Sequence, residues 1–290
     1  MIPQEIISSI TSFFNQTRNV TVDIKKSTSL SGGCINDVHR LQTNIGDFCI
    51  KFNLRTRFPG MFISEAKGLA LLKSAGEIYV PEVYHTGETG SFSYILLEYI
   101  DQGKRIPLFM NDFGRSLARL HKHTSGFFGL DIDNYMGSLP QSNKKHTRWN
   151  GFFIEERLKK QVLLASDYFS SADLMAFERL YARLDELIPV EPSALLHGDL
   201  WGGNYMVSPD GKACLIDPAV YYGHREVDIA MTTLFGGFDE QFYISYEEEY
   251  PLEKGWQKRL DIFKLYPLLI HLNLFGSGYL GSVLSIIRRF

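Results

Sequence analysis

The stretch Leu-Leu-His-Gly-Asp-Leu-Trp-Gly-Gly-Asn-Tyr at residues 195–205, followed by Leu-Ile-Asp-Pro at residues 215–218, is the most informative part of the chain. It places Asp199 and Asn204 five positions apart, with a second acid, Asp217, thirteen positions further on. Apolar runs precede both parts and predict short strands that deliver these polar side chains to neighbouring loops. In such a loop the first acid can accept a hydroxyl proton, while the Asn and the later Asp offer Mg²⁺ the oxygen ligands that it prefers.

A structural turn rich in Asp and Asn is the alternative to a catalytic loop at this place. An isolated Asp-x₄-Asn pair carries little information, because both residue types are common in turns. Here, however, the first acid follows His-Gly, the Asn lies five positions later, and the second acid follows a hydrophobic run. Together these features favour the catalytic loop of a phosphoryl-transfer enzyme.

The composition is that of an ordinary globular protein. The chain has 290 residues, of which 44% are hydrophobic, and this is enough for one large or two modest domains with a core. A net charge of −3 provides no basic surface for nucleic acid or for an anionic membrane. The N-terminal residues lack the pattern of a secretory signal, and the three cysteines have no metal-binding spacing. We therefore expect a cytoplasmic protein that binds neither nucleic acid nor membrane.

Strand-like sequence dominates the first hundred residues, and helix-like sequence dominates the rest. The predicted strands are residues 20–24, 38–41, 48–52 and 93–100. The predicted helices are residues 4–15, 64–74 with Ser64 as cap, 107–123, 150–168, 172–188, 226–235 and 256–288. A small β-rich lobe, a tether and a larger, mainly α lobe follow one another in a protein-kinase-like fold. We therefore predict an α+β chain with an ATP-binding lobe at residues 1–100 and a catalytic and substrate lobe at residues 101–290.

The N-terminal lobe of such a fold has to supply a phosphate cover and a cationic anchor. Gly32 and Gly33 lie in a turn between predicted strands, where backbone amides without a neighbouring Cβ can approach phosphate oxygens. A plain hairpin turn is the alternative for this pair. Lys51 follows on the next strand, and Glu65 on the next helix is the natural acid to hold it toward the phosphates. The order of these residues, and not any one of them, supports an ATP site.

The tether after the last strand, Glu98, Tyr99 and Ile100, is expected to present backbone N–H and C=O groups to the adenine edge. This contact requires no particular side chain, so the prediction rests on the order of the elements alone. Cys49 lies two positions before Lys51 and therefore shares its face of the strand. We expect this thiol beside the nucleotide base, with a simple buried cysteine as the alternative.

Three residues of the catalytic stretch have other predicted roles. His197 is expected to brace the loop by hydrogen bonding, and Asp228 to accept hydrogen bonds from loop amides while buried. For Trp201 two interpretations stay open, stacking on the substrate or shaping the loop. Cys34 directly follows the glycine turn, where backbone amides that favour phosphate would also favour a thiolate. We predict that oxidation of Cys34 regulates the phosphate cover, with a small residue chosen for fit as the alternative.

The assembled motifs resemble the fructosamine kinases, also called ketosamine or ketoamine kinases. Three stretches carry most of the resemblance, namely residues 196–204, the Ile-Asp-Pro-Ala-Val-Tyr-Tyr-Gly-His-Arg-Glu-Val-Asp run at 216–228, and Leu-Phe-Gly-Gly-Phe at 234–238. Further similarity extends over nearly the whole chain. Protein kinases, choline kinases and aminoglycoside phosphotransferases share only the plan of acid, Asn and acid.

The resemblance implies ATP-dependent phosphorylation, with Mg²⁺, of a sugar hydroxyl on ketoamines, either small molecules or glycated protein lysines. In the family this occurs at the third carbon and destabilises the adduct, which then releases the amine, so that the activity is one of deglycation. Two alternatives remain, a choline- or aminoglycoside-type phosphotransferase and a non-catalytic nucleotide-binding module. We expect a monomer, with a disulfide-linked dimer through Cys34 as its oxidised form.

Overall fold

A five-stranded antiparallel sheet forms the N-terminal part of the chain, in the order β1-β2-β3-β5-β4. The computed structural model describes residues 1–30, 35–236 and 238–290. Gly32, Gly33 and Cys34 therefore lie outside the described residues. The elements of this part are α1 (Gln4–Arg18), β1 (Ile24–Ser29), β2 (Asp37–Thr43), β3 (Gly46–Leu54), α2 (Met61–Ala75), β4 (Val83–Thr89) and β5 (Phe92–Glu98).

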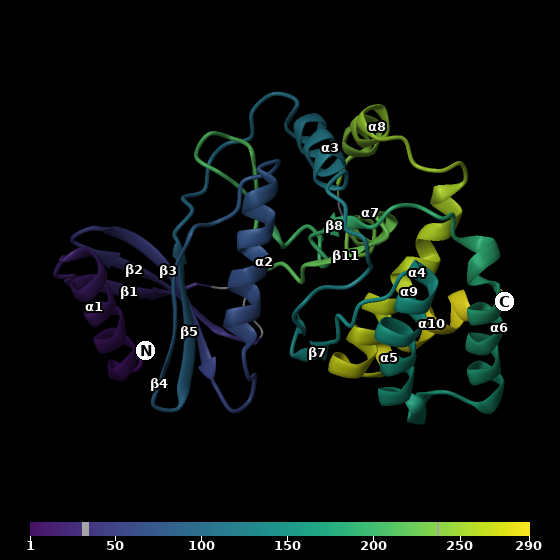
Figure 1. Cartoon of the computed structure of the whole chain (residues 1–290), viewed down its shortest axis with the longest axis horizontal. Coiled ribbons are helices and arrows are strands. Elements are labelled where there is room, and N and C mark those ends of the chain that lie inside the picture. Colours follow the sequence, from purple (N-terminus) through teal and green to yellow (C-terminus); the bar gives the residue numbers. More distant parts are fainter. Residues whose placement is uncertain (31–34, 237) are drawn as a thin grey trace.

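The two faces of this sheet are covered differently (Figure 1). On one face, α1 buries Ile6, Ile10 and Phe14 against Phe48 and Ile50 of β3. The other face is turned toward α2 and the rest of the molecule, and its apolar residues join the main core. Because successive side chains of a strand point to opposite faces, those of β3 that alternate with Phe48 and Ile50 face this second side. The same alternation that anchors α1 thus directs Cys49 and Lys51 into the interior of the molecule.

The remainder of the chain is mainly helical, with short two-stranded ladders next to the sheet. Its helices are α3 (Phe109–Leu120), α4 (Trp149–Phe152), η1 (Phe153–Leu158), α5 (Lys159–Leu164), η2 (Ser166–Tyr168), α6 (Ser171–Leu187), α7 (Glu226–Thr232), α8 (Glu240–Glu249), α9 (Trp256–Phe275), η3 (Ser277–Tyr279) and α10 (Leu280–Ile287). Its strands are β6 (Asn134–Met136), β7 (Leu139–Gln141), β8 (Ala194–Leu196), β9 (Tyr205–Val207), β10 (Ala213–Leu215) and β11 (Tyr221–Gly223).

The predicted α+β class is confirmed, with a β-rich first part and a mainly helical second part (Figure 1). The boundary between residues 100 and 101 stays a prediction; it lies between the end of the sheet at Glu98 and the start of α3 at Phe109. Within the described residues, no helix is both long enough and apolar enough to cross a membrane.

The strand predicted at residues 20–24 is wrong, because β1 begins only at Ile24. The side chain of Asn44 occupies the place of a strand partner there. Its Oδ1 accepts from the amide of Asp23 at 2.8 Å, and its Nδ2 donates to the carbonyl of Thr21 at 3.0 Å. These two bonds satisfy the backbone without a ladder, so the chain turns before it pairs.

Three predicted helices also differ from the structure. The helix expected from residue 64 begins at Met61 after Gly60, and the hydroxyl of Ser64 donates to the Met61 carbonyl at 2.8 Å, so Ser64 is no cap. The helix expected at residues 150–168 contains the π-helical segment η1. The helix expected at residues 256–288 ends at Phe275, because Gly276 adopts φ 87° and ψ −166°, which no helix accommodates.

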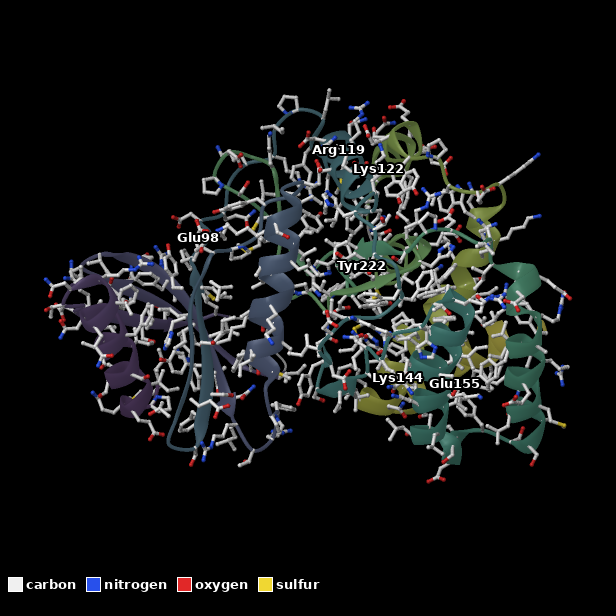
Figure 2. The ribbon with its side chains drawn as sticks, in the orientation of Figure 1. Glu98, Arg119, Lys122, Lys144, Glu155 and Tyr222 are labelled. Atoms are coloured by element: carbon white, nitrogen blue, oxygen red, sulfur yellow. The ribbon has the colours of Figure 1, made fainter. Side chains whose placement is uncertain are left out.

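Helix α8, which the sequence did not predict, lies directly against α3 (Figure 1). Their contact depends on Gly114, since a Cβ there would stand 2.2 Å from the carbonyl oxygen of Phe242. Ion pairs flank the contact, including Lys122 Nζ to Glu249 Oε1 at 2.6 Å; Figure 2 labels Lys122 beside α3. The small residue sets how closely the two helices approach, and the exposed charges contribute little to stability by comparison.

Replacing Gly114 with Ala is expected to force α3 and α8 apart and to lower the free energy of unfolding by about 1–3 kcal/mol. For a chain of this size the melting temperature falls by several degrees, on the order of 2–4 °C per kcal/mol. Gly126→Ala is the matched control, because a Cβ at Gly126 meets nothing within 4 Å. Thermal unfolding of both variants checks the prediction, and equal melting temperatures would contradict it.

Candidate active site

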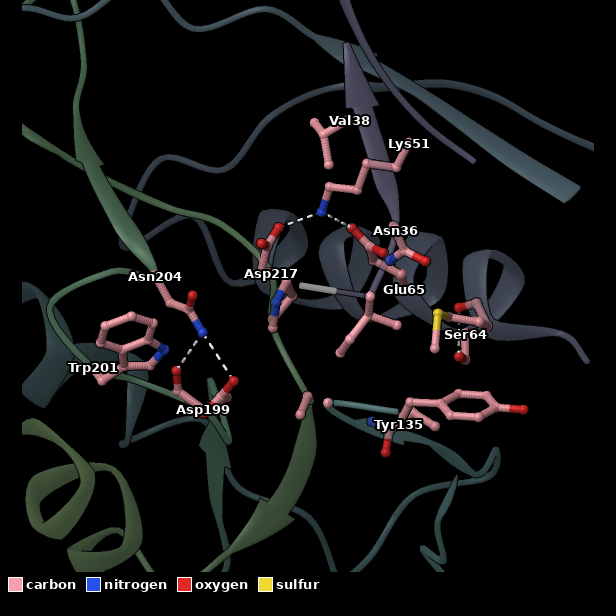
Figure 3. A pocket seen from close by; sticks show the side chains of 16 residues that line it. Asn36, Val38, Lys51, Ser64, Glu65, Tyr135, Asp199, Trp201, Asn204 and Asp217 are labelled. Carbon is pink, nitrogen blue, oxygen red and sulfur yellow. Dashed lines mark hydrogen bonds and ion pairs between the residues drawn. The ribbon is translucent and has the colours of Figure 1, made fainter. Parts of the chain in front are cut away.

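Two antiparallel ladders of three residues each bring the quoted stretches together. Strand β8 pairs with β11, and β9 pairs with β10. Two backbone hydrogen bonds join the ladders. The amide of Ala219 donates to the carbonyl of His197 at 2.9 Å, and the amide of Ile216 donates to the carbonyl of Asn204 at 3.0 Å. The loop after β8 and the loop after β10 therefore lie side by side. They carry Asp199 and Asp217 into one common space (Figure 3).

Two backbone conformations in these loops are unusual. Gly198 has φ +84°, and a Cβ on it would stand 2.1 Å from the carbonyl oxygen of Ala219, so only glycine fits. Asp217 has φ 54°, in the left-handed region that non-glycine residues rarely occupy, Asp and Asn being among the least disfavoured. Such conformations cost free energy and tend to occur at functional sites.

Asp199 lies on the floor of the site, held by Asn204. The Nδ2 of Asn204 donates to the backbone oxygen of Asp199 at 2.8 Å and to its Oδ2 at 2.9 Å (Figure 3). Burial among protein atoms raises the pKa of Asp199 to about 8, although the hydrogen bond from Asn204 acts in the opposite direction. A carboxylate with a raised proton affinity suits a general base.

Lys51 connects the sheet to the loops of the helical part (Figure 3). Its Nζ donates to Oε1 of Glu65 on α2 at 2.6 Å and also forms an ion pair with Asp217. Burial alone would lower the pKa of Lys51, but the two carboxylates outweigh it and raise the pKa above its ordinary value. Lys51 is therefore a fixed cation. The structure thus brings together the predicted set of Lys51, Glu65 and Asp217.

Asp228, at the start of α7, is fully buried and organises the loop from behind. Its Oδ2 accepts from the amide of His197 at 2.8 Å and its Oδ1 from that of Gly198 at 2.9 Å. A third contact joins Oδ2 to Nε2 of His121 at 3.2 Å, and Nδ1 of His121 is 2.7 Å from the hydroxyl of Tyr246. His197 in turn contacts the carbonyl of Ile216 through Nε2 at 2.9 Å. His121, to which sequence reasoning assigned no role in the site, links α3 and α8 to this anchor.

Three adjoining cavities meet at these residues. The hinge-side cavity, of about 390 Å³, is lined by Lys51, Asn204 and Asp217 and by Glu98, Tyr99 and Ile100. The central cavity, of about 230 Å³, contains Lys51, Glu65, Asp199, Asn204 and Asp217 together. The aromatic cavity, of about 510 Å³, begins at Asp199 and Trp201 and leads away from the sheet.

The hinge-side cavity is lined mainly by apolar residues from both parts of the molecule. Cys49 lies among them, and burial raises the pKa of its thiol to about 11. The side chain of Glu98 accepts from the hydroxyl of Tyr79 and from the amide of Glu82. Within the described part of the chain, the backbone groups of Tyr99 and Ile100 form no hydrogen bond, which leaves them available to a ligand.

The aromatic cavity contains residues that sequence reasoning missed. Trp201 is 37% exposed and makes an edge contact with Phe235, whose ring lies 4.6 Å from that of His271. The ring of His271 also lies 5.0 Å from that of Tyr279. These aromatic residues come from three distant segments, and no local sequence pattern connects them. Both interpretations of Trp201 stay open, because it lines the cavity and also contacts its neighbours in the loop.

A second group of potential metal ligands lies outside these cavities, formed by Glu191, His224 and Glu226. Each of its carboxylates already has an arginine partner. Arg225 donates to both oxygens of Glu191, and Arg259 pairs with Glu226. Burial lowers the pKa of His224 to about 4, so the ring is neutral. Both carboxylates are thus engaged in ion pairs with arginines, whereas Nε2 of His224 has no hydrogen-bond partner among the described residues.

Comparisons with known proteins agree with this geometry. The family model described as fructosamine kinase matches residues 6–290. A probable ketoamine kinase of Enterococcus faecium is 38% identical over 282 residues, covering 94% of this chain and 99% of its own. A chloroplastic protein-ribulosamine 3-kinase of Arabidopsis thaliana is 40% identical over 281 residues, covering 93% and 84%. The crystal structure of a candidate fructosamine-3-kinase from Haemophilus somnus superimposes with a TM-score of 0.89 at 31% identity, covering 99% and 98%.

The raised pKa of Asp199 predicts a pH-dependent cost to stability in the metal-free protein. The folded state holds the proton up to about pH 8, whereas the unfolded state releases it near pH 3.8, so folding loses stability as pH rises between these values. Asp199→Asn removes this cost. The melting temperature of the variant should exceed that of the wild type by an amount that grows from pH 5 to pH 8 and then levels off. A difference that is constant with pH would show that Asp199 titrates normally.

Proposed function

The chain belongs to the fructosamine kinase family and is a ketoamine kinase, and we propose that it transfers the terminal phosphoryl group of ATP to the hydroxyl on carbon 3 of a ketoamine sugar. The observation that supports this most is the position of Asp199, where the central and aromatic cavities meet. An acceptor in the aromatic cavity can present a hydroxyl to this carboxylate. A phosphoryl group in the central cavity then lies beside Lys51.

In this proposal the nucleotide occupies the hinge-side cavity. Its base contacts the backbone of Tyr99 and Ile100, and its phosphates approach Lys51, which Glu65 holds in place. Asp217 and Asn204 supply a carboxylate and an amide oxygen, which are the donors that Mg²⁺ accepts, so these residues fit the ion. The bound ion would neutralise phosphate charge. Catalysis then consists mainly of positioning and charge stabilisation, with Asp199 taking the hydroxyl proton.

The acceptor is best matched by a sugar joined to an amine. Among the residues that the structure describes, Asp199 is the only acid that lines the aromatic cavity. An aminoglycoside carries several positive charges and is recognised by several carboxylates, whereas apolar and aromatic walls suit one sugar and one amine. We therefore favour ketoamines, as small molecules or on protein lysines, over the choline- and aminoglycoside-type alternative. Phosphorylation at carbon 3 destabilises such an adduct, so the proposed role is deglycation.

Two further proposals concern parts of the chain that the structure leaves untested. A phosphate cover at Gly32 and Gly33 and redox control by Cys34 both fall outside the described residues. The protein is proposed to act as a monomer, with a disulfide through Cys34 as its oxidised form. Cys49 is a poor partner for that disulfide, because a pKa of about 11 keeps its thiol protonated at neutral pH.

The activity is tested by measuring ATP consumption with fructosamine, ribulosamine and erythrulosamine, with choline and an aminoglycoside as controls. We expect turnover of ketoamines alone. Asp199→Asn should lower kcat by about 10²- to 10⁴-fold, because it removes the proton acceptor and keeps the shape of the side chain. Turnover of the control substrates in preference to ketoamines would refute the assignment. MgATP binding without any turnover would favour the non-catalytic module.

The metal assignment is tested by MgATP binding. Asp217→Ala should weaken the affinity for MgATP by tenfold or more and abolish turnover, since it removes an anionic ligand of the ion. Asp199→Asn is the matched control, because that carboxylate faces the acceptor and should leave MgATP affinity within about twofold. Titration calorimetry with and without Mg²⁺ separates the two effects. Equal MgATP affinity in Asp217→Ala and wild type would exclude Asp217 as a ligand.

A further inference from the structure

One cation in the aromatic cavity has no role in the chemistry proposed above. Arg57 lies in the loop between β3 and α2 and lines this cavity together with Phe58. It belongs to the sheet side of the molecule, whereas His271 and Tyr279 of the same cavity belong to the C-terminal helices. An acceptor that reaches Asp199 through this cavity therefore shares the space with Arg57.

The loop that carries Arg57 is held in a defined position. Within the loop, the amide of Arg57 donates to the carbonyl of Leu54 at 3.0 Å. From β6, the hydroxyl of Tyr135 donates to the carbonyl of Pro59 at 2.9 Å. The ring of Tyr135 also meets that of Phe58 edge to face, with centroids 6.2 Å apart. The loop is thus held at the amide of Arg57 and at the carbonyl of Pro59, so the backbone that carries Arg57 has a defined position beside the cavity.

No described carboxylate neutralises the charge of Arg57. Its guanidinium lies over the ring of Phe58 at 5.2 Å, and it has no carboxylate partner in the part of the chain that the structure describes. Arg55, two positions earlier, does have one, since its Nη1 lies 3.8 Å from Glu88. The contrast is informative because both arginines are exposed residues of the same short loop.

Among the described residues that line the cavity, Arg57 is the only lysine or arginine, and the hydroxyls of Ser138 and Tyr279 carry no charge. The only described carboxylate in its lining is Asp199, which is committed to the reacting hydroxyl. The ring nitrogen Nδ1 of His271 contacts the carbonyl of Pro267 at 2.7 Å and so carries the proton, and burial lowers the pKa of the ring, which keeps it neutral. One positive charge in a mostly apolar and aromatic cavity of about 510 Å³ matches a small acceptor with one negative charge.

We propose that Arg57 is a specificity-determining residue that binds an anionic group of the acceptor, so that the enzyme prefers ketoamines that carry a negative charge. This inference rests on the proposed ketoamine kinase function. The anion has two possible sources. It is either the α-carboxylate of a glycated free amino acid or a phosphate on the sugar. Both are recognised by a guanidinium through paired N–H donors.

The test compares three adducts as substrates of wild type and of Arg57→Gln. They are the ribulosamine of valine, that of valinamide, and the valinamide adduct made from ribose 5-phosphate. Loss of a charge-assisted hydrogen bond should lower kcat/KM by roughly tenfold for the adduct that carries the recognised anion, and by less than about twofold for the neutral valinamide adduct. The first and third adducts identify whether the carboxylate or the phosphate is bound.

Arg55→Gln is the matched control and should leave kcat/KM unchanged for all three adducts, because Arg55 pairs with Glu88 outside the cavity. An effect of Arg57→Gln that is equal for charged and neutral adducts, or absent for all, overturns the inference and leaves the kinase assignment intact. If wild type phosphorylates none of the three adducts, the inference fails, and the substrate screen with fructosamine and erythrulosamine decides separately whether the proposed function fails with it.

Discussion

The paired contact of one buried ammonium group with two acids holds the site together. Lys51 comes from the sheet, Glu65 from the helix that covers it, and Asp217 from the loops of the second half of the chain. A buried lysine without partners would be strongly disfavoured, so the fold has to bring both carboxylates to it. The alternation of β3, the placement of α2 and the loop after β10 all meet this requirement. The relative position of sheet and helices follows from it.

Behind this pair, a second buried acid plays a different part. Asp228 touches no cavity, yet it accepts from two consecutive amides of the catalytic loop and contacts His121. Unpaired amides at that depth would each cost about 1–3 kcal/mol, so the loop is held in one conformation. Asp199, the proposed proton acceptor, thereby has a rigid support. Asp199 lines the central and aromatic cavities, whereas the conformation of its loop is determined by buried groups that do not contact a substrate.

The sequence predicted the site well where order along the chain determines position in space. Each element fixes one side chain, so three residues could be placed, namely Lys51 on a strand, Glu65 on the following helix and Asp217 after a later strand.

Other features depend on partners far away in the sequence. Helix α8 was missed because its sequence is strongly acidic and its burial depends on the space left by Gly114. The strand at residues 20–24 was wrong because a single side chain, Asn44, replaced the ladder. Arg57 could not be placed in the aromatic cavity from the sequence, because the opposite wall of that cavity comes from the C-terminal helices.

The left-handed backbone at Asp217 bears on how such an enzyme can lose its activity over evolutionary time. Most replacements at this position combine the loss of the anion with backbone strain of about 1–2 kcal/mol. Asn and Gly are exceptions, since both tolerate this conformation and each is one nucleotide away from an Asp codon. The accessible route to inactivity therefore keeps the loops, the cavities and Lys51 in place. A descendant that followed it would keep the folded site without its proposed metal ligand, and this one position would mark the change.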